Sequence, residues 1–374
     1  MKFRIEQRTF EELLVNVAPA IPRRPPLPLL AAVEISAADT DRVTASVYDF
    51  EVAARASGTA TAVVEAGSAL VSGRLLAEVA RLLPPTHPVE VFTDATDLHV
   101  GCEEIAFTLP LLPIDDYPAL PPVPDVIGTV AGRELDDAVQ AVTSAAGKDD
   151  TLPMLTGVKV EFHPSHLRLV ATDRFRIGIR DVGWSPGARI AGEQQVHSVV
   201  VPAKALSEAV RTLQCAEINV AASSGDGVLG LRSEASHRTL RLMDQQFAPY
   251  DRHLIEDYST SASVSTSELT TAVKRVALMA TGHAQILLAV SDSSVELTAG
   301  GPTDGRARQM LPCSVSGEPT TVAFNAKFLI DALGASDSAT TTIGLNGPTR
   351  AATFRPEPRT NTDRHILMPV RLPT

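Results

Sequence analysis

The fold is decided by three stretches of the chain, SALVSGRLLAEVARLL (68–83), SVVVPAKALSEAVRTL (198–213) and TTVAFNAKFLIDALGA (320–335), which align without gaps. Each begins with alternating apolar residues, passes a small or polar residue, and continues with apolar residues three to four positions apart. Alternation predicts a strand, and the longer spacing predicts an amphipathic helix. Each stretch therefore predicts a strand that leads into a helix.

The repeat has the length of a domain. Its basic residues Arg74, Lys204 and Lys327 lie 130 and 123 residues apart, which is too long for a solenoid unit. A first helix is predicted ahead of each of these helices, in FEELLVNVAPAI, ELDDAVQAVTSA and ELTTAVKRVALM, which start at Phe10, Glu134 and Glu268. Each unit therefore has two helices.

Strand pairs are predicted between the two helices of each unit. RVTASVYDFEVAAR in the first unit matches LRLVATDRFRIGIR in the second, with Phe50 against Phe175 and Arg55 against Arg180. The third unit has SVELTAGGPTDGRARQML at this place, with a looser turn. We expect an α+β protein in which each domain packs two helices on antiparallel sheets.

Proline-rich stretches mark where the units join. DDYPALPPVPD (115–125) and QQFAPYDRHLIED (245–257) fall between the repeats, and proline stiffens a connector. The sequence therefore predicts three domains, at residues 1–126, 127–256 and 257–374.

Composition limits the classes of protein that remain. With 374 residues, 44% of them hydrophobic, the chain can form two or three domains. The start MKFRIEQRTF is charged and no run of about 18 apolar residues occurs, which predicts a cytoplasmic protein without membrane contact. Three separated cysteines argue against a disulfide framework and a zinc ribbon. The net charge of −11 requires any DNA-binding surface to concentrate its positive charge locally.

Basic residues recur at one position of the second helices. Arg81 and Arg211 follow Arg74 and Lys204 by seven residues, or two helical turns, so each pair shares a face. Scattered Arg and Lys are ordinarily solvated surface, but this recurrence favours a basic inner wall that meets phosphates. The candidates for DNA contact are Arg24, Arg74, Arg81, Lys204, Arg211, Lys274, Arg275 and Lys327.

Four motifs, taken together, resemble the bacterial DNA polymerase III beta subunit, the sliding clamp, in its actinobacterial form. They are DDTLPMLTGV (149–158), ATDRFRIGIR (171–180), FNAKFLIDAL (324–333) and RHILMPVRL (364–372). The likeness extends over essentially the whole chain, in the order of the three repeats.

The resemblance implies a head-to-tail homodimer whose six similar domains form a ring around double-stranded DNA, with helices lining the hole. Contacts with phosphates would be weak and independent of sequence. The family pattern places Phe107 and Leu109, on an edge strand, against Leu278 and Met279 of a second copy; the alternative is that these four residues belong to the core. No cofactor is implied, because ring opening in the family uses the ATP of a separate clamp loader.

The family also docks the replicative polymerase, the clamp loader, other polymerases and repair proteins through a hydrophobic cleft that takes short linear peptides. Aliphatic residues suit the anchors of a peptide, while Thr and Arg at the rim orient its backbone or an acidic residue. Without the resemblance, Asp173 is simply a turn residue and MPVRL a terminal strand. Matching the motifs gives Leu155, Thr172, Arg174, Phe175, Arg176, Ile177, Pro249, Arg252, His253, Ile366, Met368, Pro369, Val370 and Arg371.

One segment departs from the family pattern. The family has an aromatic-Pro pair and then a basic stretch, whereas this chain displaces the proline to Pro249, has the acid Asp251, and has His253 where an aliphatic residue is expected. Drift within a lineage explains such changes, and so does a specialised second clamp whose cleft discriminates against a small cyclic-peptide-like inhibitor. The second explanation is the hypothesis of antibiotic resistance.

Two other classes of function remain as alternatives. An enzyme is disfavoured, because the chain lacks GxSxG, HExxH and Walker-type motifs. His163 and His166 have an HxxH spacing, but Pro164 between them suits a turn better than a metal site, and Asp115 and Asp116 suit a solvated loop. The other alternative is a clamp-fold scaffold for proteins that does not encircle DNA.

Overall fold

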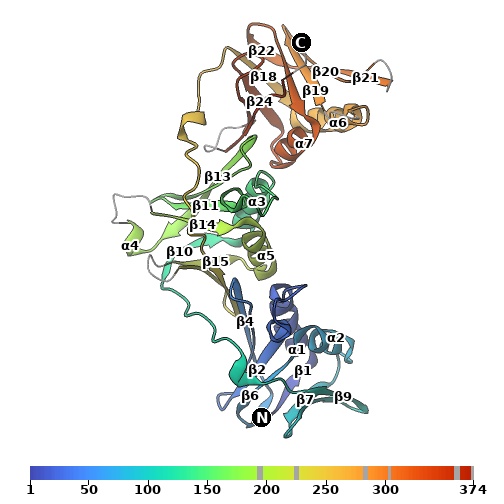
Figure 1. The fold of residues 1–374 in the computed structure, drawn as a ribbon, viewed down its shortest axis with the longest axis vertical. Helices are drawn as coiled ribbons and strands as arrows, with labels where there is room; N and C mark the ends of the chain where they lie inside the picture. Colours follow the sequence, from blue (N-terminus) through green and yellow to red (C-terminus); the bar gives the residue numbers. More distant parts are fainter. Residues whose placement is uncertain (192–196, 223–226, 281–284, 302–304, 358–362, 372–374) are drawn as a thin grey trace. The chain divides into compact units, whose positions relative to one another are not determined.

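The computed structural model describes residues 1–191, 197–222, 227–280, 285–301, 305–357 and 363–371 (Figure 1). Within it, the chain divides into two compact units. The first unit comprises Met1–Arg133, Ser185–Gly192 and Glu208–Leu242, and the second comprises Glu134–Trp184, Glu193–Ser207 and Met243–Thr374. Both units combine antiparallel sheets with helices, so the predicted α+β class is confirmed.

The first unit contains two runs of antiparallel strands. The shorter run has the order β5 (Ala62–Glu65), β1 (Lys2–Glu6), β7 (Pro88–Thr93), β8 (Asp97–Cys102) and β9 (Ile105–Pro110). The longer run has the order β6 (Gly67–Ser72), β2 (Ala32–Ala38), β3 (Arg42–Tyr48), β4 (Val52–Thr59), β17 (Ser236–Arg241), β16 (Val228–Arg232), β15 (Glu217–Ala222) and β10 (Val126–Ala131).

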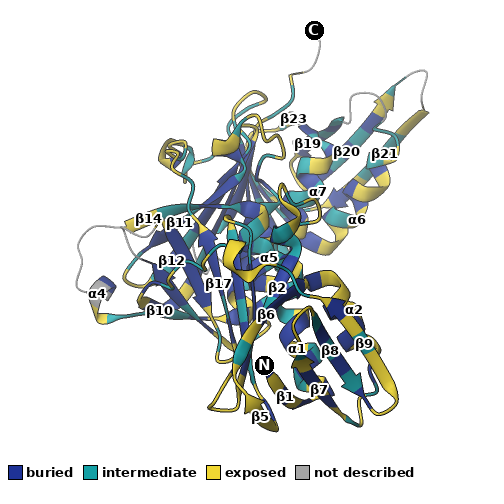
Figure 2. Ribbon diagram, turned by 60° about the horizontal axis from the view of Figure 1, so that its bottom comes forward, coloured by how far each residue is buried: buried dark blue, intermediate teal, exposed yellow. Residues whose placement is uncertain are grey.

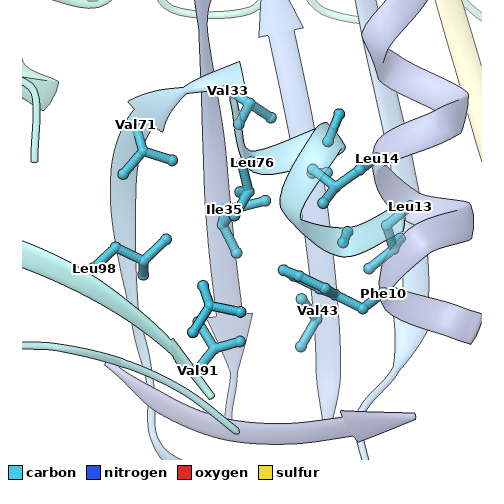
Figure 3. Packing of buried hydrophobic residues seen from close by; sticks show 14 of the residues in the cluster. Phe10, Leu13, Leu14, Val33, Ile35, Val43, Val71, Leu76, Val91 and Leu98 are labelled. Atoms are coloured by element: carbon cyan, nitrogen blue, oxygen red, sulfur yellow. The ribbon is translucent and has the colours of Figure 1, made fainter. Parts of the chain in front are cut away.

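Helices α1 (Gln7–Val17) and α2 (Gly73–Leu82) cover the core of this unit (Figure 3). Phe10 and Leu14 of α1 and Leu76 of α2 are almost fully buried, together with strand residues such as Ile35 and Val43. Their spacing of three to four residues gives each helix one buried and one exposed face, which Figure 2 shows in contrasting colours. Burial of these side chains stabilises the unit by about 1.5–3 kcal/mol for each large residue.

The second unit has the same two-sheet plan. Its longer run has the order β14 (His197–Pro202), β11 (Gly157–Phe162), β12 (His166–Thr172), β13 (Arg176–Pro186), β26 (Arg364–Leu367), β25 (Ala352–Glu357), β24 (Thr340–Leu345), β18 (Thr260–Ser265) and β22 (Ser314–Gly317). Its shorter run has the order β21 (Gly305–Pro312), β20 (Ser294–Gly301), β19 (Gln285–Ser291) and β23 (Thr320–Asn325).

Helices α6 (Thr266–Ala277) and α7 (Ala326–Gly334) pack on the strands of the second unit and on each other (Figure 1). Helix α6 lies beside β19, β20 and β21, and α7 lies beside β23 and β26. Side chains define where both helices begin: Ser265 Oγ accepts from the amide of Glu268, and Asn325 Oδ1 accepts from the amide of Lys327 at 2.9 Å. The remaining helices are α3 (Gly132–Thr143), α4 (Ala188–Ala191) and α5 (Ala203–Leu213), with 3₁₀ turns at Ala18–Ala20, Pro28–Ala31, Ile114–Asp116, Pro153–Leu155 and Asp251–His253.

Sheets run continuously from one repeat into the next. β4 of the first repeat pairs with β17 of the second, and β13 of the second pairs with β26 of the third. The middle repeat is thereby shared between the two units. The domain limits at residues 126 and 256 remain a prediction from the sequence.

The structure corrects two details of the repeat. The second helices begin at Gly73, Ala203 and Ala326, so the third stretch must shift by one residue and starts at Thr321. The hairpin turns also align differently from the prediction. Asp49 and Asp173 each accept from the amides two and three residues later, so these aspartates correspond.

The corrected turn pairs Phe50 with Arg174, both with positive φ, of 73° and 77°. The predicted matches of Phe50 with Phe175 and Arg55 with Arg180 were therefore wrong by one residue. The predicted alignment matched the two aromatic side chains, but the feature that is repeated is the backbone turn.

Candidate functional site

A cavity of about 290 Å³ in the second unit brings together most of the residues predicted for peptide binding. It is formed by the turn between β12 and β13, the connector before β18, and strand β26 with the residue after it. The predicted residues that line it are Thr172, Arg174, Arg176, Ile177, Pro249, Arg252, His253, Ile366 and Met368. We call this cavity the cleft.

The floor of the cleft is apolar. Ile177 and Ile366 are directly paired across β13 and β26, and they share a buried cluster with Val170, Ile179 and Tyr250. Ile366 is 2% exposed, so only a small part of it meets a ligand. An apolar floor with a few polar groups at the rim is typical of sites that take aliphatic or aromatic anchors.

The sequence prediction missed Tyr250 and Ala248, which also line the cleft. Tyr250 is 3% exposed, and its hydroxyl donates to Glu161 Oε2 at 3.0 Å. Burial and the neighbouring Glu161 carboxylate raise the pKa of Tyr250, so the phenol stays protonated and donates. An aromatic residue beside Pro249 in the connector was a visible signal for this position.

Arg176 belongs to the wall of the cleft but is not free to orient a peptide, contrary to its predicted role at the rim. Its guanidinium contacts Asp173 at 2.9 Å and Asp331 at 2.6 Å, and it stacks on the ring of Phe328 at 4.2 Å. The side chain is 4% exposed. Arg176 therefore holds the hairpin turn against α7, while the exposed Arg174 has its charge at the surface.

His253 and Arg252 introduce polarity into the connector side of the cleft. Arg252 Nε donates to His253 Nε2 at 3.2 Å, which requires a neutral imidazole with its proton on Nδ1. Partial burial, reinforced by the charge of Arg252, lowers the pKa of His253. A neutral histidine is therefore available at this wall near pH 7, where its Nδ1–H is a potential donor.

Five residues predicted for the cleft do not line it. Leu155 is 6% exposed, and its carbonyl accepts from Gly147 at 2.7 Å. Phe175 is 58% exposed at the tip of the turn, while the amide of Val370 donates to Ala323 at 2.8 Å. Residues of one motif follow one another along the chain, but alternate residues face opposite sides of a strand. Outside the lining are Leu155, Phe175, Pro369, Val370 and Arg371.

A larger depression of about 740 Å³ lies between α3, β13 and α7 and contains none of the predicted residues. Its lining is rich in carboxylates, among them Glu134, Asp137 and Asp337. Arg180 contacts Asp363 there at 3.2 Å, and burial raises the pKa of Asp363. This acidic and polar lining suits peptide anchors less well than the apolar floor of the cleft, although the depression is larger.

All eight residues predicted to contact DNA are exposed. Among the residues that the structure describes, none of the eight is in an ion pair; Arg74 Nη2 donates to the carbonyl of Pro22 at 2.7 Å. They lie in α2, α5, α6 and α7 or shortly after α1. Each repeated cation is followed four residues later by an acid, as in Arg74 and Glu78, which reduces the net positive charge of the helix face.

The residues predicted for a subunit interface divide into exposed and buried ones. Leu278 is 74% exposed, and Phe107 and Met279 are half-buried. Leu109 is only 2% exposed and belongs to the core of the first unit, so its predicted role as a contact residue is contradicted. Side chains alternate along β9, which turns Leu109 inward.

The histidines considered for metal binding contact separate carboxylates. His163 and His166 stack with ring centroids 4.3 Å apart, and their Nε2 atoms face Glu161 at 3.2 Å and Asp181 at 3.6 Å. Within the described part of the chain, no three His, Cys, Asp or Glu residues form a group that could hold a metal ion. Asp115 and Asp116 are exposed in a single 3₁₀ turn. No described helix is long and apolar enough to cross a membrane.

Comparison with known families agrees with this geometry. Residues 1–121, 129–249 and 252–371 match the N-terminal, central and C-terminal domains of the DNA polymerase III beta subunit. The chain belongs to the DNA polymerase III beta subunit family. It is thus built from three clamp domains, as the sequence predicted.

Relatives of this beta-subunit chain extend over its full length. It is 35% identical to the beta sliding clamp of Streptomyces coelicolor, with 100% of both chains covered. It is 33% identical to the beta sliding clamp homolog GriR of Streptomyces muensis, with 99% of each covered. The structure of the sliding clamp of Pseudomonas aeruginosa bound to griselimycin has the same fold, with a TM-score of 0.91, 23% identity and complete coverage of both chains.

Proposed function

We propose that two copies of this chain close head to tail into a ring around duplex DNA and there hold the replicative polymerase, without catalysing a step themselves. The observation that carries this proposal is the continuity of the sheets across the repeats, considered with the family membership. We place the protein in the cytoplasm, where the chromosome is replicated.

The pairing between repeats has a regular chemistry. Ala54 of β4 is paired with Arg238 of β17, and Gly178 of β13 is paired with His365 of β26. In both cases a small residue faces a large side chain that is almost completely buried, since Arg238 is 2% and His365 3% exposed. An ideal side chain at Gly178 would meet the His365 ring at 3.1 Å, so the space is already filled.

Two further edge strands, β21 and β9, carry a small and a large residue at the corresponding positions. Ala307 of β21 corresponds to Gly178, because both pair with an alanine one strand inward, Ala299 and Ala171. On the strand that carries the large residue, this residue precedes a buried leucine by two positions. In β17, for example, Arg238 precedes Leu240, which is 0% exposed.

In β9 the corresponding residue is Phe107, two positions before the buried Leu109. The described β9 and β21 each pair with a single strand, β8 and β20. We therefore infer that β9 of one copy adds to β21 of another, with Phe107 opposite Ala307. Exposed Leu278 at the end of α6 would extend the same contact. Two such contacts close a ring.

Passage of DNA through this ring would use the exposed helix faces with Arg74, Lys204 and Lys327. Contacts with phosphates carry no sequence information, and the acids interspersed on these faces keep them weak, which suits sliding. A scaffold that does not encircle DNA has no need of cations at repeated positions. Reversing the three charges would leave a scaffold intact and would lower the retention of a clamp on DNA.

The experiment that tests the ring is retention on circular DNA. The purified protein is loaded with a matching clamp loader and ATP, and the bound fraction is measured before and after the circle is cut. Retention on the circle and loss from free ends supports a sliding ring. Absence of retention with a loader that is active on its own clamp contradicts the proposal.

We propose that the cleft takes the short linear motifs of the polymerase, the loader, other polymerases and repair proteins. Support comes from its apolar floor of Ile177 and Ile366 and from the exposed Arg174 at its rim. Direct binding of a labelled peptide with leucine and phenylalanine anchors measures this. Substitution of Ile177 by Asp should abolish binding, and unchanged affinity would contradict the assignment.

A second candidate function is that of a specialised clamp copy whose cleft disfavours a cyclic-peptide inhibitor. The observation that favours it is the polar pair Arg252 and His253 in the cleft wall, together with the full-length similarity to GriR. Competition between griselimycin and a linear peptide, measured for this chain and for the Streptomyces coelicolor clamp, tests it. We expect weaker inhibitor binding here, and His253→Val should strengthen it. Equal affinities for the two clamps would refute the idea.

A further inference from the structure

The connector that supplies one wall of the cleft is fixed at two points. At one end Tyr250 is buried against Ile177 and Ile366, and its hydroxyl donates to Glu161 at 3.0 Å. At the other end the carboxylate of Glu256 contacts two arginines of the neighbouring sheet. The wall residues Arg252 and His253 lie between these points.

Between these points the connector has one short turn, and Leu254 packs against the buried cluster of the cleft floor. Asp251–His253 is a single 3₁₀ turn, closed by the amide of His253 to Tyr250 at 2.9 Å and the amide of Leu254 to Asp251 at 3.0 Å. A turn of this length is not stable by itself. The positions of Arg252 and His253 therefore depend on the fixed points on either side.

Glu256 contacts two arginines at once, one through each oxygen of its carboxylate. Its Oε2 lies 3.1 Å from Arg355 Nη1, and its Oε1 lies 3.1 Å from Arg364 Nη2. The two arginine side chains are 6% and 4% exposed, whereas that of Glu256 is 54% exposed. Burial, and after it the adjacent charge of Arg355, lower the pKa of Arg364, whereas the hydrogen bond and the charge of Glu256 act in the opposite direction.

Arg355 also holds the connector directly. Its Nη2 donates to the carbonyl of Ile255 at 2.8 Å and to the hydroxyl of Tyr258 at 2.6 Å. The guanidinium lies 5.1 Å from the centroid of the Tyr258 ring. Backbone and side chains of residues 255–258 are thus tied to one point on β25.

The arginines belong to the strands that form the cleft floor. Arg364 precedes Ile366 by two residues on β26, and side chains two apart lie on the same face of a strand. Arg355 lies on β25, the strand that pairs with β26. The carboxylate thereby links the connector wall to the strand that carries the floor residue.

We propose that Glu256 is a positioning residue of the cleft, which holds the Arg252–His253 wall at its distance from Ile366 by bridging Arg355 and Arg364. This role rests on the proposed function of the cleft as a peptide site. Loss of the charged bridge leaves this end of the wall held only by the hydrogen bonds of Arg355 to Ile255 and Tyr258 and by the packing of Leu254. A peptide must then order the wall further as it binds, and it dissociates faster.

The test is the affinity of Glu256→Gln for a fluorescent, end-blocked pentapeptide with leucine and phenylalanine anchors and one aspartate. Glutamine keeps the shape but loses the charge, and we expect the Kd to rise at least fivefold, mainly through faster dissociation. Glu318→Gln is the matched control: it removes the same charge from an exposed position of the same unit and should bind as the parent does.

Binding is measured well below the thermal transition of each variant, because a merely stabilising role would lower Tm without changing the Kd of the folded protein. Glu256→Asp keeps the charge on a shorter side chain, so its Kd should lie between those of the parent and Glu256→Gln. If Glu256→Gln does not fold, Glu256→Asp is compared with the parent in its place, and a raised Kd is expected. Equal Kd values for the parent and both variants overturn the inference alone. No binding by the parent chain overturns the proposed peptide site together with the inference.

Discussion

Replacing His365 by Phe should remove a defined part of the acid sensitivity of this protein. His365 is buried in β26 opposite Gly178, and burial, reinforced by the charges of Arg180 and Arg176, lowers its pKa to about 3. In the unfolded chain the pKa is 6.5. Phe is a suitable replacement, because Phe107 occupies the corresponding position of the first repeat.

The sign and size of the effect follow from this difference in pKa. Above pH 6.5 the imidazole is neutral in both states and the free energy of unfolding does not depend on it. Below pH 6.5 only the unfolded chain binds the proton, so the free energy of unfolding falls by about 1.4 kcal/mol for each pH unit. The loss contributed by His365 is about 2 kcal/mol at pH 5 and about 4 kcal/mol at pH 3.

Urea denaturation measured by tryptophan fluorescence is the assay. Trp184, the sole tryptophan of the chain, lies on β13 and reports unfolding of the strand paired with β26. At pH 7.5 the parent and His365→Phe should have similar midpoints. At pH 5 the variant should be more stable by about 2 kcal/mol, since all other titrating groups are common to both proteins. Parallel shifts of the two midpoints between pH 7.5 and pH 5 would refute the reasoning.

Three further outcomes are expected. Gly178→Val should destabilise the second unit by about 1–3 kcal/mol, because a side chain there overlaps the ring of His365; a thermal melt measures this, and an unchanged Tm would show that the space is not filled. Phe107→Ser should leave the stability of the folded chain nearly intact but shift the monomer–dimer equilibrium toward monomer in sedimentation experiments, whereas Leu109→Ala should cost about 2–5 kcal/mol of stability with little specific effect on association. Tyr250→Phe should cost about 1–3 kcal/mol, because a buried carboxylate loses a donor, and an unaltered urea midpoint would contradict this.

Much of the fold could be predicted from the sequence because secondary structure leaves a local pattern. Alternation in RVTASVY and three-to-four spacing in GRLLAEVARL are imposed by which side chains meet the core. The register in which the repeats align was predicted less accurately. The match of Phe50 with Phe175 followed similar side chains, while the structure repeats a backbone turn one residue away.

The cleft shows the same division. Ile177, Ile366 and His253, which the resemblance assigned to one site, line the same cavity, and their role in peptide binding stays a prediction. The motifs also included Leu155, which is buried outside the lining, and omitted Tyr250, which belongs to it. A motif does not specify which of its side chains point inward.

The sequence by itself determined that three domain-sized copies of a strand-and-helix unit exist, that their helices carry cations at one repeated position, and that connectors rich in proline join them. Each of these properties is local or periodic along the chain. Only the tertiary structure decided which small residue faces which large one between repeats, that Arg176 is occupied by Asp173 and Asp331, and that Glu256 bridges Arg355 and Arg364. These contacts join residues up to 187 positions apart in sequence, as Gly178 and His365 are. Their partners are selected by shape and charge in space, which no local pattern records.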